Sequence, residues 1–561
     1  METGDEGGGP AAGDEAVLQR YDRLTDECRV QFEVLHQVPQ YGSYWRGFFT
    51  AAFDRFTALW KLQRAHRALL MERRQFGRVE IGDMASRIAQ IYFHFYLRSA
   101  NRYYLKQAQE FLEAVRSRRY FDVDPGASAR GARELHAKRF RCLARYLAIA
   151  LLLRSATPFL ETLIRNMREV PFANGQQVAD EAAAFLQAAL GPCAELDELG
   201  VWPPVPEAPR SPSLPPHLDL GICLLVSSVR GQRRFSEVNL DLFRMAGSLE
   251  RRGVHAEGAP KHLLYRPSSN LLLAVLASAL ANMPVKAACL IYLAAPPAPL
   301  EPAETVSHAH SASPTGAERD LGDQMQVNES GSEDEDEDED ELAPDGVLLS
   351  VAPSLPATDP EAAHEAMSAV LTFRDVYFAL RHPLILIVDS HSACCFDLLV
   401  TNVELKTVLV LAAPAFWPPH AQSPAQGSVL AALLTQPTIG LLRLLRGYDF
   451  VCQVAPLHTL AQLHADLVAL RRLLLQPAVR GFHACLANDF VASYVATITA
   501  AVALLRRLQW PARATPTMYP GSLLEQLVAH VAETAELTTA QTTLREFGIV
   551  EQEHWLLTAS D

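Results

Sequence analysis

The strongest candidate for chemistry is a short polar stretch that directly follows a predicted buried strand. The strand is Pro383–Asp389, a run rich in β-branched residues, and it leads into the sequence Ser-His-Ser-Ala. Because α/β sheets bind ligands beyond the carboxyl ends of their strands, an aspartate at this position suggests a metal site of the Asp-x-Ser-x-Ser adhesion type. In this chain His391 and Ala393 stand where that pattern requires serine. We therefore expect no metal here and interpret Asp389 as a cap for the following turn.

Other sequence patterns that carry chemistry are missing or incomplete. The chain has neither a Gly-x-Ser-x-Gly nucleophile elbow nor a glycine-rich phosphate loop. His458 and His464 are six residues apart, which is off the four-residue spacing that aligns two ligands on one helix face. We interpret Cys394 and Cys395 as small buried residues rather than a redox pair. We expect no catalytic, cofactor-binding or metal-binding residues, no cofactor, and no enzyme activity.

A cluster of cations is the main candidate for partner binding. From Arg20 to Val170 there are 27 Lys/Arg against 15 Asp/Glu, a charge of +12, so the rest of a chain with net charge −14 carries −26. Clustered cations can bind phosphate or an acidic peptide, although an ordinary solvated helix end has the same composition. Sequence-specific DNA reading is not indicated, since no helix-turn-helix, zinc or basic-zipper pattern occurs. The cluster comprises Arg116, Arg118, Arg119, Lys138, Arg139 and Arg141.

These cations lie in a region of amphipathic helices. Its central segment, Ile81–Asn101, has apolar or aromatic residues around most of a helix, so neighbouring helices must enclose it. Short turns between the helices predict an antiparallel stack of hairpins with a weak tetratricopeptide character. One narrow polar stripe crosses the central helix, formed by Asp83, Arg87, His94 and Arg98. The other helices are expected at 15–35, 44–71, 103–115, 138–153, 158–170 and 177–190.

The hydrophobic pattern changes after residue 216. Short continuous apolar runs are typical of strands buried on both faces, and helices are expected between and after them. This order predicts a mostly parallel sheet with helices on its faces. The strands are expected at 220–226, 287–293, 383–389 and 407–413, and the helices at 235–252, 270–283, 427–435, 457–475, 483–507 and 523–537.

We therefore predict an α + α/β protein, with an antiparallel helical domain followed by a mostly parallel α/β sheet domain. An acidic insertion interrupts the sheet domain, and nine consecutive acids, Glu333–Glu341, lie within it. Such a segment repels itself and lacks apolar side chains, so we expect disorder. Acidic neighbours make Ser330 and Ser332 candidate phosphorylation sites. The expected boundaries are 1–14 disordered, 15–190 basic helical domain, 191–216 proline-rich linker, 217–295 first part of the α/β domain, 296–361 insertion, 362–545 second part with the C-terminal helices, and 546–561 tail.

Cysteine usage and hydropathy indicate an intracellular protein. The nine cysteines are odd in number and never spaced Cys-x-x-Cys, which favours a reducing compartment. The apolar run Val491–Leu505 is shorter than the roughly 20 residues that cross a bilayer. We expect it to be a buried core helix, and we expect no membrane association.

One set of stretches lies in consistent order from about residue 20 to about residue 525, and it includes Val38–Gly42, Ile81–Gln90, Asp241–Met245, His262–Pro267, Leu290–Leu293 and Pro383–Ser390. These stretches resemble the SCAI (suppressor of cancer cell invasion) family. The resemblance implies a non-enzymatic protein of the nucleus and cytoplasm. Members of that family repress actin-responsive transcription and cell migration by binding the myocardin-related coactivator with serum response factor, and they act at DNA double-strand breaks through a repair scaffold protein. The family offers no catalytic residues to carry over.

Two alternatives to a binding protein remain open at this stage. One is an enzyme that uses the sheet edge near Asp389 and Ala412, and an open polar pocket there would favour it. The other is a membrane-associated signalling protein that depends on Val491–Leu505. A filled, apolar sheet edge would favour the binding protein.

Overall fold

A computed structural model describes most of the chain. The described residues are 10–38, 44–74, 76–99, 101–123, 126, 128–198, 218–229, 231–235, 238–249, 261–284, 287–295, 347–348, 370–371, 373–391, 393, 407–453 and 455–549. The acidic run with Ser330 and Ser332, the pair Cys394 and Cys395, and the end of the tail therefore lie outside the described residues.

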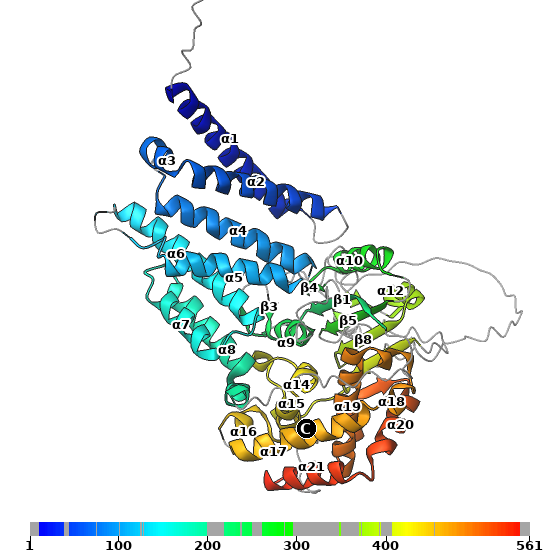
Figure 1. Ribbon diagram of the computed structural model, residues 1–561. Coiled ribbons are helices and arrows are strands. Elements are labelled where there is room, and N and C mark those ends of the chain that lie inside the picture. Colours follow the sequence, from blue (N-terminus) through cyan, green and yellow to red (C-terminus); the bar gives the residue numbers. More distant parts are fainter. Residues whose placement is uncertain are drawn as a thin grey trace, which may run out of the picture.

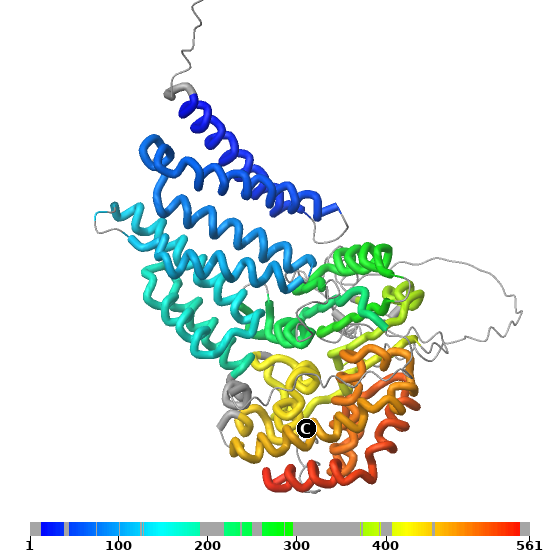
Figure 2. Tube along the Cα trace, in the orientation of Figure 1, coloured from blue at the N-terminus to red at the C-terminus, as the bar shows by residue number. Residues whose placement is uncertain are grey.

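The N-terminal part is a stack of antiparallel helices (Figures 1 and 2). Side-chain caps fix two of its turns, because Asn101 accepts a hydrogen bond from the Tyr103 amide and Ser128 from the Gly131 amide. The first helix begins at Pro10, inside the segment expected to be disordered, and the helix expected at 44–71 is broken at His66. The helices are α1 (Pro10–Gln37), α2 (Trp45–Ala65), α3 (Arg67–Arg74), α4 (Arg78–Ser99), α5 (Arg102–Ser117), α6 (Ala129–Leu152), α7 (Thr157–Arg168) and α8 (Gly175–Glu198).

The polar stripe of α4 joins it to its neighbours. Asp83 forms an ion pair with Lys138 of α6 at 2.5 Å, and Arg87 lies over the ring of Phe32 in α1. The buried Arg98 guanidinium donates to the Val38 carbonyl at 2.9 Å. The stripe therefore makes contacts between helices of the stack, which agrees with the expectation that neighbouring helices enclose α4.

A six-stranded sheet forms the middle of the molecule, in the order β10-β9-β8-β5-β1-β4 (Figure 1). All neighbouring strands are parallel except β10 and β9. The fold class predicted from the sequence is confirmed, but the edge strands β4 and β10 were not predicted, and the helix expected at 235–252 begins only at Leu240. The strands of this sheet are β1 (Leu220–Ser227), β4 (Lys261–Tyr265), β5 (Ala288–Ala294), β8 (Leu384–Asp389), β9 (Val408–Ala412) and β10 (Thr517–Tyr519).

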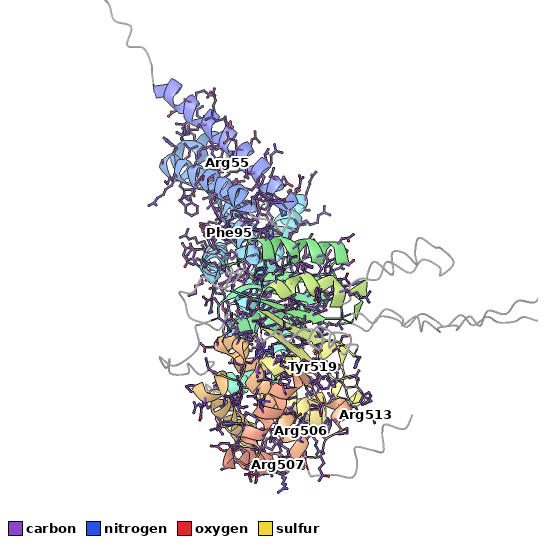
Figure 3. All side chains as sticks on the ribbon, turned by 90° about the vertical axis from the view of Figure 1, so that its right-hand side faces the viewer. Arg55, Phe95, Arg506, Arg507, Arg513 and Tyr519 are labelled. Carbon is purple, nitrogen blue, oxygen red and sulfur yellow. The ribbon has the colours of Figure 1, made fainter. Side chains whose placement is uncertain are left out.

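Helices cover both faces of the sheet. On one face lie α10 (Ser269–Ala281) and α12 (Phe373–Val376), and the other face packs in one continuous core with α9 (Leu240–Leu249) and the C-terminal helices. Figure 3 shows the molecule from the side, with the helical stack above and the C-terminal helices below the sheet. The C-terminal helices are α14 (Val429–Thr435), α15 (Pro437–Arg446), α16 (Tyr448–Gln453), α17 (Leu457–Leu474), α18 (Pro477–Arg480), α19 (Asp489–Arg507), α20 (Gly521–Val531) and α21 (Ala535–Glu546).

The apolar helix α19 lies inside this C-terminal part. Within the described ranges it is the one helix that is long and apolar enough to cross a bilayer. Every residue from Phe490 to Leu505 is buried by other elements of the fold. α19 is therefore a buried core helix, as expected from the sequence.

Candidate functional site

Asp389 lies at the carboxyl end of the sheet, as the sequence predicts, but in a buried polar cluster. It is the last residue of β8, and its carboxylate accepts a hydrogen bond from the Tyr292 hydroxyl of β5 at 2.9 Å. A second carboxylate, Asp241, projects from the first turn of α9, and the Gln232 side chain donates to it. Asp241 is 0% exposed and Asp389 only 8%. Two acids are thus held together where an α/β sheet usually binds its ligand.

Two buried arginines balance the charge of these acids. Arg244, one turn after Asp241 on α9, lies 3.9 Å from it and donates to the Ala188 carbonyl of α8 at 3.0 Å. Arg443 of α15 is 1% exposed. Its guanidinium donates to four backbone carbonyls, those of Ala421 at 2.9 Å, Gln426 at 3.1 Å, Gly427 at 2.7 Å and Ser428 at 3.5 Å. The arginines therefore connect the sheet edge to the helical stack and to the C-terminal helices.

The segment that precedes α14 closes the cluster. The Ser428 amide donates to both carboxylate oxygens of Asp241, at 3.0 and 3.1 Å. Gly427 has a φ of +75°, and a Cβ on it would overlap the side chains of Asp241 and Arg244. Only glycine fits this backbone conformation and this close approach. The chain itself therefore occupies the crevice at the sheet edge.

Burial and charge set the ionisation of the cluster. Loss of solvent, together with the nearby Asp241, raises the pKa of Asp389 to about 7. Burial also raises the pKa of Asp241, although Arg244 opposes the shift. Burial and the neighbouring Arg244 lower the pKa of Arg443 to about 10. Ionising both acids in this site therefore has a cost, which the two arginines and the hydrogen-bond donors around the acids offset.

The sheet edge at Asp389 is neither the open polar pocket expected of an enzyme nor the filled, apolar edge expected of a binding protein. It is polar, as an enzyme would require, but it is filled by the chain, as a binding protein would require. His391 faces the loop after β9, where its Nδ1 lies 3.0 Å from the Ala415 carbonyl oxygen, and Ala393 is buried. Among the described residues, no group of three or more His, Cys, Asp and Glu side chains could hold a metal ion. The cluster joins three parts of the fold, and its described side chains do not open onto solvent.

Most of this cluster was missed by the sequence analysis. Asp241, Arg244 and Arg443 are isolated charges in strongly apolar runs, namely Leu240–Met245 and Ile439–Leu445. Charged side chains are almost never fully buried unless they are paired. That rule could have identified them as buried partners, although not as partners of Asp389.

The predicted cation cluster is located where α4, α5 and α6 meet. Arg139 pairs with Asp122 at 3.2 Å and Lys138 with Asp83 at 2.5 Å, so two of the predicted cations tie α6 to its neighbours. Arg116 pairs within α5 with Glu113 at 2.7 Å.

The remaining cations of the cluster face solvent. Arg118 donates to the Tyr120 hydroxyl at 3.1 Å, and Arg118, Arg119 and Arg141 are all exposed. These three form no ion pair within the part of the chain that the structure describes. We call the surface formed by these three residues and the half-buried Arg139 the basic end.

Comparisons with known proteins follow the sequence resemblance. A family model described as Protein SCAI matches residues 23–260 and 252–459. Protein SCAI of Homo sapiens is 26% identical over 469 residues, which are 77% of this chain and 72% of that protein. Protein SCAI of Mus musculus is 28% identical over 321 residues, or 50% of this chain and 52% of that protein. The Protein SCAI homolog of Dictyostelium discoideum is 29% identical over 280 residues, or 42% of this chain and 35% of that protein. No solved structure matches the chain.

Proposed function

The chain belongs to the SCAI family, and we propose that it is a non-enzymatic regulatory protein that acts by binding other proteins. In its specific form, the proposal is a transcriptional corepressor of the nucleus and cytoplasm. It would bind the myocardin-related coactivator with serum response factor and so reduce actin-responsive transcription. The family match over both the helical stack and the sheet supports the general proposal.

The closed sheet edge is the structural observation that carries the non-enzymatic part of the proposal. Catalytic acids and bases must reach the substrate within hydrogen-bonding distance. Here the two carboxylates of Asp241 and Asp389 are buried, and the Ser428 amide and the Tyr292 hydroxyl already donate to them. These groups serve the fold, and the outer surface is where partners bind.

The basic end is the surface that we propose for partner binding. Arg118, Arg119 and Arg141 are exposed cations on a helical stack whose charge from Arg20 to Val170 is +12. Like charges gathered on one surface attract segments of the opposite charge and accelerate their association. We therefore propose that acidic segments of the coactivator bind there.

Reversing three charges at the basic end should weaken this binding. We expect the variant Arg118→Glu, Arg119→Glu, Arg139→Glu to capture an acidic segment of the coactivator about tenfold less well, because attraction becomes repulsion and the effect is largest at low salt. The measurement is a pull-down with titrated coactivator segment at two salt concentrations. The same variant should fail to restore repression of an actin-responsive reporter in depleted cells.

A matched control separates local from overall charge. The triple variant Arg20→Glu, Arg23→Glu, Arg29→Glu makes the same change in net charge on exposed positions of α1. It should capture the segment nearly as well as the unmodified chain. Equal loss in both variants, or loss in neither, would show that the basic end is not the binding surface.

A further inference from the structure

Six aromatic side chains form a continuous surface between α2 and α5. The Phe53 and Tyr104 rings stack across the two helices with centroids 6.2 Å apart, and the Trp60 ring meets Phe111 edge-on at 5.8 Å. Tyr92 of α4 lies between them, with its centroid 4.8 Å from that of Phe53 and 5.8 Å from that of Phe111. We call this the aromatic surface, and it consists of Phe53, Trp60, Tyr92, Tyr103, Tyr104 and Phe111.

The pairing gives the aromatic surface a defined direction and length. Phe53 of α2 contacts Tyr104 of α5, and Trp60, further along α2, contacts Phe111, further along α5. The two helices therefore run in the same direction. Seven residues separate the two members on each helix, which is two helical turns or about 10.5 Å. The surface therefore matches two turns of a bound helix.

None of the six side chains is buried, although each ring contacts at least one other ring of the set. Trp60 is 38% exposed and Tyr103 is 58% exposed, and the remaining four are half-buried. Phe53, Tyr92, Tyr104 and Phe111 also pack against the buried core of the helical stack, so Trp60 and Tyr103 provide most of the exposed aromatic area. Partly exposed Tyr and Trp side chains are the residue types enriched at the centres of protein interfaces.

Unpaired cations lie near both ends of the aromatic surface. Lys61 and Arg64 follow Trp60 on α2, and Lys106 lies on α5 between Tyr103 and Phe111. All three are exposed and form no ion pair among the described residues. The exposed acids nearby are Asp54 and Glu110. The border therefore carries a net positive charge.

We propose that the aromatic surface binds an amphipathic helix of a protein partner. The helix presents apolar side chains seven residues apart to the aromatic surface and has acidic residues beyond them, next to Lys61, Arg64 and the basic end. Apolar anchors spaced over two turns are the usual way in which a helix occupies such a surface. This inference rests on the proposed function only in that the partner is a protein, and it identifies a second contact surface and the kind of segment that fits it.

The test uses a synthetic probe and the full chain. The probe is a fluorescent helical peptide of about 18 residues. It has leucines at positions i, i+3 and i+7, and Asp or Glu at the other positions near one of its ends. We expect Trp60→Gln and Tyr103→Ser each to weaken its binding about tenfold in fluorescence anisotropy, because each removes an aromatic contact at the interface. Phe482→Ser, at a position 44% exposed in the C-terminal part, should leave binding unchanged. Circular dichroism of each variant checks that the helices remain folded.

Two control peptides and one variant define the outcomes. A peptide with lysines in place of the acids, and a peptide with serines in place of the leucines, should both bind much more weakly than the probe. Equal binding of the serine peptide, or no effect of Trp60→Gln and Tyr103→Ser, overturns the proposal, and so does failure of the probe to bind. If only the triple charge reversal at the basic end weakens binding of the probe, the proposed function is retained and the proposal for the aromatic surface is overturned.

Discussion

Replacing Arg443 with methionine should lower the free energy of unfolding by about 3–5 kcal/mol, the usual cost of removing one partner from a buried charged cluster. Methionine keeps much of the volume of the side chain but removes its donors. The carbonyls of Ala421, Gln426 and Gly427 lose the guanidinium that they accept from. Asp241 and Asp389 lose one of the two cations that offset their burial.

Chemical denaturation at neutral pH measures this effect. The matched control is Arg513→Met, because Arg513 is an exposed arginine whose guanidinium lies over the Phe416 ring at 5.8 Å. It lies at the outer surface of the C-terminal part (Figure 3), and its replacement should change the free energy of unfolding by less than about 1 kcal/mol. The double variant Arg443→Met, Asp241→Asn should recover part of the loss, since it removes an acid together with its cation. A loss below about 1 kcal/mol for Arg443→Met would show that the cluster does not stabilise the fold.

The sheet was predictable where its strands are central, and not where they are edges. β1, β5, β8 and β9 are buried along almost their whole length, so each appears in the sequence as a continuous apolar run. β4 (Lys261–Tyr265) contains Lys and His, and β10 (Thr517–Tyr519) has only three residues. An edge strand is covered on fewer sides, so its sequence carries a weaker signal.

The closed cluster was predictable at one residue only. Asp389 was identified because it directly follows a buried apolar strand in the sequence. Local sequence alone therefore places it at the edge of the sheet. Its surroundings depend on contacts between distant segments, such as Arg244 with the Gln426 carbonyl, 182 residues apart. The hydrophobic periodicity of a sequence carries no information about such a contact. For the same reason, the sequence identified the cations of the basic end but not the ion pairs of Lys138 with Asp83 and of Arg139 with Asp122.

Acidification from pH 7 to pH 5 should destabilise the protein through its buried histidines. Burial is the main cause that lowers the pKa of His94 to about 3, of His262 to about 4 and of His464 to about 4. An unfolded histidine takes up a proton near pH 6.5, whereas these three stay neutral in the folded chain. The unfolded state therefore binds more protons below pH 6.5, and stability is lost as the pH falls.

His94 gives the clearest single-site test of this prediction. At pH 5, about 1.5 pH units below the pKa of a free histidine, its share of the loss is about 2 kcal/mol. His94→Gln cannot take up the proton, so its free energy of unfolding should fall by about 2 kcal/mol less between pH 7 and pH 5. The ring of His94 lies 5.5 Å from that of His36 between α4 and α1, so the N-terminal helices should separate first on acidification.

Asp389 acts in the opposite direction and provides the control. Its pKa is raised to about 7, above the value of about 4 in an unfolded chain, so the folded state holds the proton first as the pH falls. This residue therefore adds stability on acidification, and Asp389→Asn should make the loss between pH 7 and pH 5 larger. Denaturation of the two variants and the unmodified chain at both pH values decides the matter. If His94→Gln and Asp389→Asn shift the pH dependence in the same direction, or not at all, then burial does not set the ionisation of these groups in the way that their positions require.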